Sequence, residues 1–170
     1  TGAGEKMILP CTENLQYSGR IDFDYEGGPL WVYPCSYVKL RFKGKSIKAV
    51  MTNQRSYWQS EMGWILDGKE GRAVLRDEGE TVFTIGEDLG DGEHELCLYK
   101  RMDACHRVVF HGFVVSEDFV LLKPNAKPTR RIEVFGDSVS AGEVSEAIDY
   151  CGQSDPEHNG EYSNSYYSYA

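Results

Sequence analysis

A series of short strand-like segments between residues 36 and 120 is the feature that most constrains the fold. Residues 36–43 alternate between apolar and basic side chains, which is typical of a strand with one buried face. Asp67-Gly68 and Asp91-Gly92 are turn signals of the kind that join antiparallel strands. Because no long apolar pattern of helical period interrupts this span, it predicts a mainly β protein, a β-sandwich of the jelly-roll type.

Six further segments have the composition of strands. The run from Cys105 to Val115 is apolar on both faces and is predicted to be a central strand. Trp64 begins an apolar segment and is predicted to pack in the core. The strands predicted in addition to 36–43 cover residues 47–52, 64–66, 73–75, 81–85, 93–99 and 105–115.

Residues 123–129 break this pattern with two prolines among polar residues, which predicts an exposed connector between domains. We therefore expect a β-sandwich domain at 1–128 and the N-terminal part of a second domain at 129–170. In the second domain we expect a strand at 131–135, loops from Ser138 and over 150–162, and a helix start at Tyr166. About 40 residues cannot bury a core alone, so this domain is expected to be incomplete.

The sequence Gly136-Asp137-Ser138 stands where the strand predicted at 131–135 ends. A serine in this position presents its hydroxyl at the edge of a parallel sheet, and its own N–H is available as an oxyanion donor. Asp, Ser and Gly also suit ordinary turns for local hydrogen-bonding reasons, so the motif by itself leaves a purely structural turn open.

The charge distribution argues against a nucleic-acid partner. The net charge is −9, of which residues 132–170 carry −8 because they contain no Lys or Arg. Phosphate binding requires clustered basic side chains, which this chain lacks. No apolar run approaches the roughly 18 residues that span a membrane, so no membrane partner is expected. A neutral polymer such as an acetylated polysaccharide fits this charge balance.

The five cysteines show no CxxC spacing, and His106 and His111 are predicted on opposite faces of a strand. Neither pattern indicates a metal site or a cofactor. Cys97 and Cys105 flank a predicted turn and are close enough in sequence to pair there. Reduced and mostly buried cysteines are the favoured interpretation.

Several of these segments resemble carbohydrate esterase family 2, acetyl-xylan esterases in which a jelly-roll module precedes an SGNH (GDSL-like) hydrolase domain. The resemblance rests on residues 17–20, 37–42, 100–106, 131–142 and 159–165. It covers nearly the whole chain but only the first half of a family protein.

The resemblance implies that Ser138 is the nucleophile and an oxyanion donor, and that Gly136 and Asp137 shape its turn. It implies removal of O-acetyl groups from xylan or related oligosaccharides through an acyl-enzyme intermediate. In the family the catalytic base is a histidine near the C-terminus, and the other oxyanion donors precede it. None of these blocks is present here, and His158 is a poor substitute because family members do not use this position. We therefore expect the 170-residue chain alone to be inactive without the rest of the hydrolase domain.

A non-catalytic carbohydrate-binding module is the alternative interpretation. Tyr57 and Trp58 lie in a polar segment, residues 53–60, and are the candidates for an aromatic platform that stacks on sugar rings. An accessory wall that orders the hydrolase half and needs no ligand of its own is favoured over independent glycan binding. The chain shows no signal-peptide pattern, and only the family resemblance favours secretion.

Overall fold

The computed structural model describes residues 4–54, 56, 59–142 and 145–153. Within these residues two six-stranded antiparallel sheets face each other. The first sheet contains β1 (Glu5–Ile8), β3 (Ile21–Asp22), β4 (Leu30–Trp31), β6 (Ile47–Gln54), β9 (Glu80–Gly86) and β11 (Arg107–Ser116). The second contains β2 (Gln16–Ser18), β5 (Tyr37–Lys43), β7 (Glu61–Leu66), β8 (Lys69–Val74), β10 (His94–Lys100) and β12 (Val120–Leu122). The predicted jelly-roll sandwich is confirmed.

The strand order explains how the short strands are used. The first sheet has the order β3-β4-β11-β6-β9, and the second has the order β12-β5-β10-β7-β8. β1 also pairs with β11, and β2 also pairs with β5, in each case along a stretch that the neighbouring short strand leaves unpaired. β11 and β5 are therefore paired on both edges, as expected for the apolar run at 105–115.

The core lies between the sheets. The alternation at 36–43 has the predicted effect, because Val38, Leu40 and Phe42 of β5 are buried. They pack with a group from the other sheet that includes Trp31 and Phe110, whose ring centroids lie 5.5 Å apart. Trp64 packs against this core, as predicted, and stacks on Phe83.

Turn residues have the roles that their chemistry predicts. Asp67 and Gly68 both have positive φ (50° and 79°) and join β7 to β8, which therefore begins at Lys69, four residues before the predicted strand. In β11 a bulge between Phe110 and Gly112 shifts the register against β6. Gly112 has a φ of 110° there, and a side chain at this position would meet the Ile8 carbonyl oxygen.

The region after the sandwich differs from the prediction. Residues 131–135 do not form a strand, because no described strand offers them the partner that a strand requires. Ser138 begins a short helix, α1 (Ser138–Ala141), instead of a loop, and a 3₁₀ turn, η1 (Ile148–Tyr150), follows. The predicted helix start at Tyr166 lies outside the described residues.

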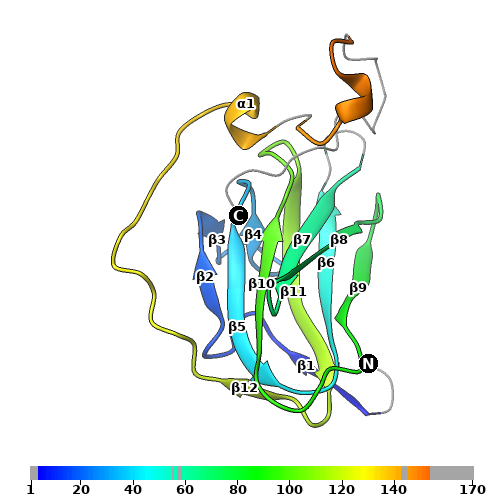
Figure 1. The fold of residues 1–170 in the computed structure, drawn as a ribbon, viewed down its shortest axis with the longest axis vertical. Coiled ribbons are helices and arrows are strands. Elements are labelled where there is room, and N and C mark those ends of the chain that lie inside the picture. The colour runs from blue at the N-terminus through cyan, green and yellow to red at the C-terminus, as the bar shows by residue number, and fades with distance from the viewer. Residues whose placement is uncertain (1–3, 55, 57–58, 143–144, 154–170) are drawn as a thin grey trace.

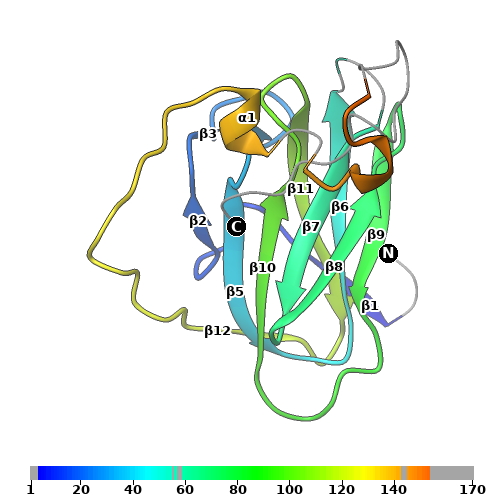
Figure 2. The ribbon, with the colours of Figure 1, turned by 45° about the horizontal axis from the view of Figure 1, so that its top comes forward.

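The connector runs outside the sandwich along the β2 side and returns to α1 at the far end (Figures 1 and 2). It is attached to the second sheet by polar contacts. Gln16 Nε2 donates to the Asn125 carbonyl at 3.0 Å, and Arg41 Nη1 donates to the Lys123 carbonyl at 3.2 Å. Lys127 donates to the Tyr17 carbonyl. As a result α1 lies beside the loop between β10 and β11, whereas β12 lies at the opposite end of the sandwich (Figure 1).

The cysteines are reduced in the structure, and the possible Cys97–Cys105 pair does not form. The expectation that they are mostly buried is wrong. Cys11, Cys105 and Cys151 are exposed because they lie in turns and loops rather than on inward-facing strand positions. In the described part of the chain, no helix is long and apolar enough to cross a membrane.

Candidate functional site

The turn that carries Ser138 is built by its neighbours. Asp137 caps α1, because its carboxylate accepts a hydrogen bond from the Val139 N–H at 3.1 Å. Its carbonyl accepts from the Ala141 N–H at 3.0 Å, and Gly142 closes the helix with a φ of 87°. The three consecutive residues of the motif have distinct roles: Gly136 leaves room for the Ser140 side chain, Asp137 caps the turn and Ser138 begins it.

Ser138 is half-buried at the first position of α1. Its backbone N–H donates to no other group in the described part of the chain, because the Asp137 carboxylate takes the Val139 N–H instead. A first-turn N–H left without an intrahelical partner is able to donate to a ligand oxygen. The geometry is therefore compatible with the oxyanion role predicted for Ser138.

The loop after β10 lies against α1. Met102 is fully buried and forms a small apolar cluster with Ala141 of α1. Lys100 fixes this loop from inside, because its buried Nζ donates to the Met102 carbonyl at 2.6 Å and also to the Asp103 carbonyl. Burial lowers the pKa of Lys100 to about 7.

A network of charged groups continues this contact. Arg101, only 5% exposed, lies with its Nη1 3.5 Å from Glu61 Oε2 on β7. Its Nη2 lies 2.5 Å from Glu146 Oε1, and Arg72 Nη1 on β8 lies 2.9 Å from Glu146 Oε2. Burial raises the pKa of Glu61, although the guanidinium of Arg101 acts in the opposite direction. The sandwich thus contacts the segment after Ser138 through two arginines.

Sequence reasoning did not find this network. Residues 100–106 are singled out in the sequence only by the family resemblance, and Glu61, Arg72 and Glu146 carry no local signal. They are far apart in the sequence. The pairing of β7, β8 and β10 brings Glu61, Arg72 and Arg101 together, and Glu146 contacts the two arginines from the segment after α1.

Tyr57 and Trp58, the predicted aromatic platform, lie outside the described residues. His158 also lies outside them. A groove on the outer face of β5, β10 and β7 is lined by residues that include Lys39, Arg41, Glu95 and Cys97, and no Tyr, Trp or Phe lines it. Trp31 is fully buried and belongs to the core.

The two histidines singled out in the sequence have structural contacts. His106 is fully buried, and His111 Nε2 lies 2.7 Å from Thr52 Oγ1. Within the described part of the chain, no group of three or more His, Cys, Asp or Glu side chains is arranged to hold a metal ion.

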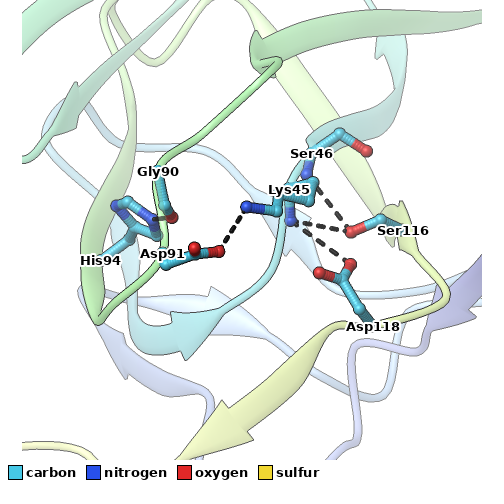
Figure 3. A network of polar contacts seen from close by, with 7 residues as sticks. All are labelled: Lys45, Ser46, Gly90, Asp91, His94, Ser116 and Asp118. Carbon is cyan, nitrogen blue, oxygen red and sulfur yellow. Dashed lines mark hydrogen bonds and ion pairs between the residues drawn. The ribbon is translucent and has the colours of Figure 1, made fainter.

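A second polar network lies at the opposite end of the sandwich from α1. Figure 3 shows Lys45 between two carboxylates: its Nζ lies 2.5 Å from Asp91 Oδ1, and its N–H lies 3.4 Å from Asp118 Oδ1. The Ser116 hydroxyl accepts from the N–H groups of Lys45 and Ser46. These contacts join the β5–β6 turn to two neighbouring loops.

The fold and the Ser138 turn together place the chain among proteins in which a jelly-roll sandwich precedes a Gly-Asp-Ser turn. A family model described as "Carbohydrate esterase 2 N-terminal" matches residues 17–124. The chain belongs to this family.

Known relatives agree with this assignment. The chain is 30% identical over 170 residues to the cellulase/esterase CelE of Acetivibrio thermocellus. It is similar to a family two carbohydrate esterase from Clostridium thermocellum solved in complex with cellohexaose, with 25% identity, 87% of this chain covered and a TM-score of 0.73. The fold is also that of the acetyl xylan esterase Est2A from Butyrivibrio proteoclasticus, with 18% identity, 94% of this chain covered and a TM-score of 0.72.

These relatives are much longer than the described chain. The match spans 98% of this chain but 20% of CelE, and 45% and 43% of the two solved structures.

Proposed function

We propose that this chain is the first part of a serine carbohydrate esterase, which removes O-acetyl groups from xylan or related oligosaccharides with Ser138 as its nucleophile. The observation that carries the proposal is the Gly136-Asp137-Ser138 turn, capped and held against a sandwich of the carbohydrate esterase 2 N-terminal family.

The proposed reaction divides the work among few groups. The Ser138 oxygen attacks the acetyl carbonyl carbon while a general base takes the hydroxyl proton, because neutral serine is a weak nucleophile. The N–H of Ser138 donates to the carbonyl oxygen as it becomes negative. Collapse expels the sugar oxygen, which takes the proton from the base and becomes a hydroxyl, and leaves an acetyl ester on Ser138. Water then attacks this ester while the base takes one of its protons. The base gives that proton to the departing serine oxygen, and the acetyl group leaves as acetic acid.

The base and the remaining oxyanion donors are proposed to come from the rest of the hydrolase domain. The apolar side chains around the turn support this division, because they have the composition of a face that another part of a domain covers. Ile132, Phe135 and Val139 are 87%, 83% and 83% exposed, and Ile148 is also exposed. We accordingly propose a boundary near residue 128, with a complete sandwich at 1–128 and an incomplete hydrolase domain at 129–170.

The proposed substrate rests on the relatives. Est2A is an acetyl xylan esterase, and the C. thermocellum enzyme is solved with a bound cello-oligosaccharide. An acetylated polysaccharide or oligosaccharide of β-linked sugars is therefore the substrate class that we propose.

The test is the Ser138→Ala variant of the protein extended through the remaining hydrolase domain, assayed on acetylated xylan and on 4-nitrophenyl acetate. We expect turnover to fall by about 10³-fold or more, with unchanged unfolding of the sandwich. Ser116→Ala is the matched control, because it removes a serine hydroxyl at the opposite end of the sandwich from α1. Unchanged turnover of the Ser138 variant would end the proposal.

Non-catalytic glycan binding is the second candidate, and the cellohexaose held by the C. thermocellum relative favours testing it. It predicts affinity of the chain for xylan or cello-oligosaccharides that survives Ser138→Ala and is lost in the Tyr57→Ala/Trp58→Ala double variant. Titration calorimetry with cellohexaose and xylohexaose separates the two candidates.

A further inference from the structure

The segment after Ser138 is fixed to the sandwich by a charged contact whose two halves differ in exposure. Arg101 is 5% exposed, whereas the Glu146 side chain that it meets is 35% exposed. Glu146 lies eight positions after the serine, in a turn, and the described residues that follow it form the 3₁₀ turn η1. The buried arginine is therefore the fixed partner, and the glutamate is the group being held.

Three contacts make Arg101 a rigid support. Its guanidinium faces the buried Glu61 carboxylate of β7, which offsets its charge inside the protein. The preceding residue, Lys100, is fully buried and holds the loop through the carbonyls of Met102 and Asp103. A guanidinium presents several donors in a planar fork, so Arg101 can face Glu61 and Glu146 at the same time.

A second contact restrains the same turn from its other side. Met102, next to Arg101, packs on Ala141, and Ala141 lies one helical turn after Ser138. The apolar contact sets the distance between α1 and the loop, whereas the Glu146 carboxylate prevents the following segment from rotating away. These two contacts join the loop between β10 and β11 to the turn of Ser138 and to the segment after it.

We propose that Arg101 is a positioning residue for the nucleophile: through Glu146, and together with the Met102–Ala141 contact, it fixes the Ser138 turn in its reactive orientation. The sandwich then contributes to turnover without touching the substrate. This inference rests on the proposed esterase function, and the experiment below separates the failure of one from the failure of the other.

The primary variant is Glu146→Ala in the protein extended through the hydrolase domain. It leaves the buried Arg101–Glu61 pair in place, so folding is preserved. We expect kcat for 4-nitrophenyl acetate to fall by about 10- to 100-fold, because a small displacement of a reacting group has a large effect on rate. KM is expected to change by less than about twofold, because the variant removes a contact between the sandwich and the segment after Ser138 that is proposed to act on orientation rather than on binding.

Arg101→Lys tests the other partner without leaving Glu61 unpaired. The lysine keeps the charge but loses the fork, so an intermediate fall in kcat is expected. Glu133→Ala is the matched control. It removes an ion pair with Arg20 (3.0 Å) that also joins the sandwich to the segment around Ser138, but both of its side chains are more than 60% exposed. It is expected to leave kcat and KM unchanged.

Amide hydrogen exchange of residues 138–142 provides a readout that is independent of esterase activity. In Glu146→Ala we expect at least about tenfold faster exchange of these amides, with β5 and β10 unchanged. If Ser138→Ala shows that the protein is no serine esterase, faster exchange still supports the positioning contact. Exchange equal to that of the parent overturns the inference, whatever happens to kcat. A rise in KM with kcat unchanged also overturns it.

Discussion

The backbone of Gly136 lies directly against the side chain of Ser140, so that a Cβ atom at position 136 would lie 2.1 Å from the Ser140 Oγ. Only glycine fits at this point of the turn without a shift of Ser140, which belongs to α1. Steric fit therefore explains Gly136 in the motif, and helix capping explains Asp137.

Gly136→Ala is expected to displace α1 and the Ser138 that begins it. In the extended protein we expect esterase turnover to fall by about 100-fold. Thermal unfolding of the sandwich should shift by less than about 2 °C, because residue 136 has no contact with the core. Gly90→Ala is the control, since a Cβ there meets nothing within 4 Å. Equal activity of the two variants would show that the fit of Gly136 against Ser140 has no role.

The bulge of β11 provides a stability prediction. At Gly112 a Cβ would lie 2.2 Å from the Ile8 carbonyl oxygen, and φ is 110°. Gly112→Ala is expected to lower the free energy of unfolding by about 3 kcal/mol or more, because β1 must move away from β11. Gly68→Ala has a positive φ but open space around it, so we expect a loss of only about 1 kcal/mol. Urea unfolding measures both, and similar losses would contradict the role given to the close approach.

The pair of His94 and Asp67 provides a pH prediction. His94 Nδ1 lies 2.7 Å from Asp67 Oδ2, and Nε2 lies 2.9 Å from the Gly90 carbonyl oxygen, a contact drawn in Figure 3. Both partners are acceptors, so the ring donates from both nitrogens only when it is protonated. The hydrogen bond to Asp67 raises the pKa of His94 above 6.5, while burial and the charge of Lys45 act against this.

The sign of the effect follows from that shift. A raised pKa in the folded state stabilises the protein below pH 6.5, and this contribution is lost as pH rises through the folded-state pKa. At low pH the pair is lost when the Asp67 carboxylate becomes protonated. Burial raises the pKa of Asp67, but the hydrogen bonds from the Glu95 N–H and from His94 outweigh burial and lower that pKa below 3.8. The pair therefore persists to below pH 3.8. We therefore expect the parent to exceed His94→Gln in unfolding free energy by more at about pH 6 than at about pH 9. A difference that is the same at both pH values would contradict the prediction.

Local patterns predicted the sandwich well, because strands such as β5 and β9 alternate between buried and outward-facing residues. In β5 the period-two pattern determines which face is buried. The Asp67-Gly68 turn likewise predicts the hairpin of β7 and β8. The short strands β1 to β4 were not predicted, since segments of two to four residues carry too little pattern. Their existence depends on the free edges of β11 and β5, which is a long-range property.

The predictions for the site divide in the same way. The Gly136-Asp137-Ser138 turn is a local structure, and its chemistry is readable from three adjacent residues. The strand predicted at 131–135 is absent because apolar composition alone does not provide a pairing partner. The contact of Arg101 with Glu146 joins positions far apart in the sequence, so it could be seen only after folding.

The most direct test of the central claim, that Ser138 belongs to a site completed by the rest of a hydrolase domain, is 4-nitrophenyl acetate hydrolysis. The 170-residue chain and the extended protein are assayed side by side at equal concentration, each with its Ser138→Ala variant. We predict turnover only in the extended protein, and its loss in the serine variant. Serine-dependent turnover by the 170-residue chain would contradict the claim, because a base within the chain, such as His158, would then suffice.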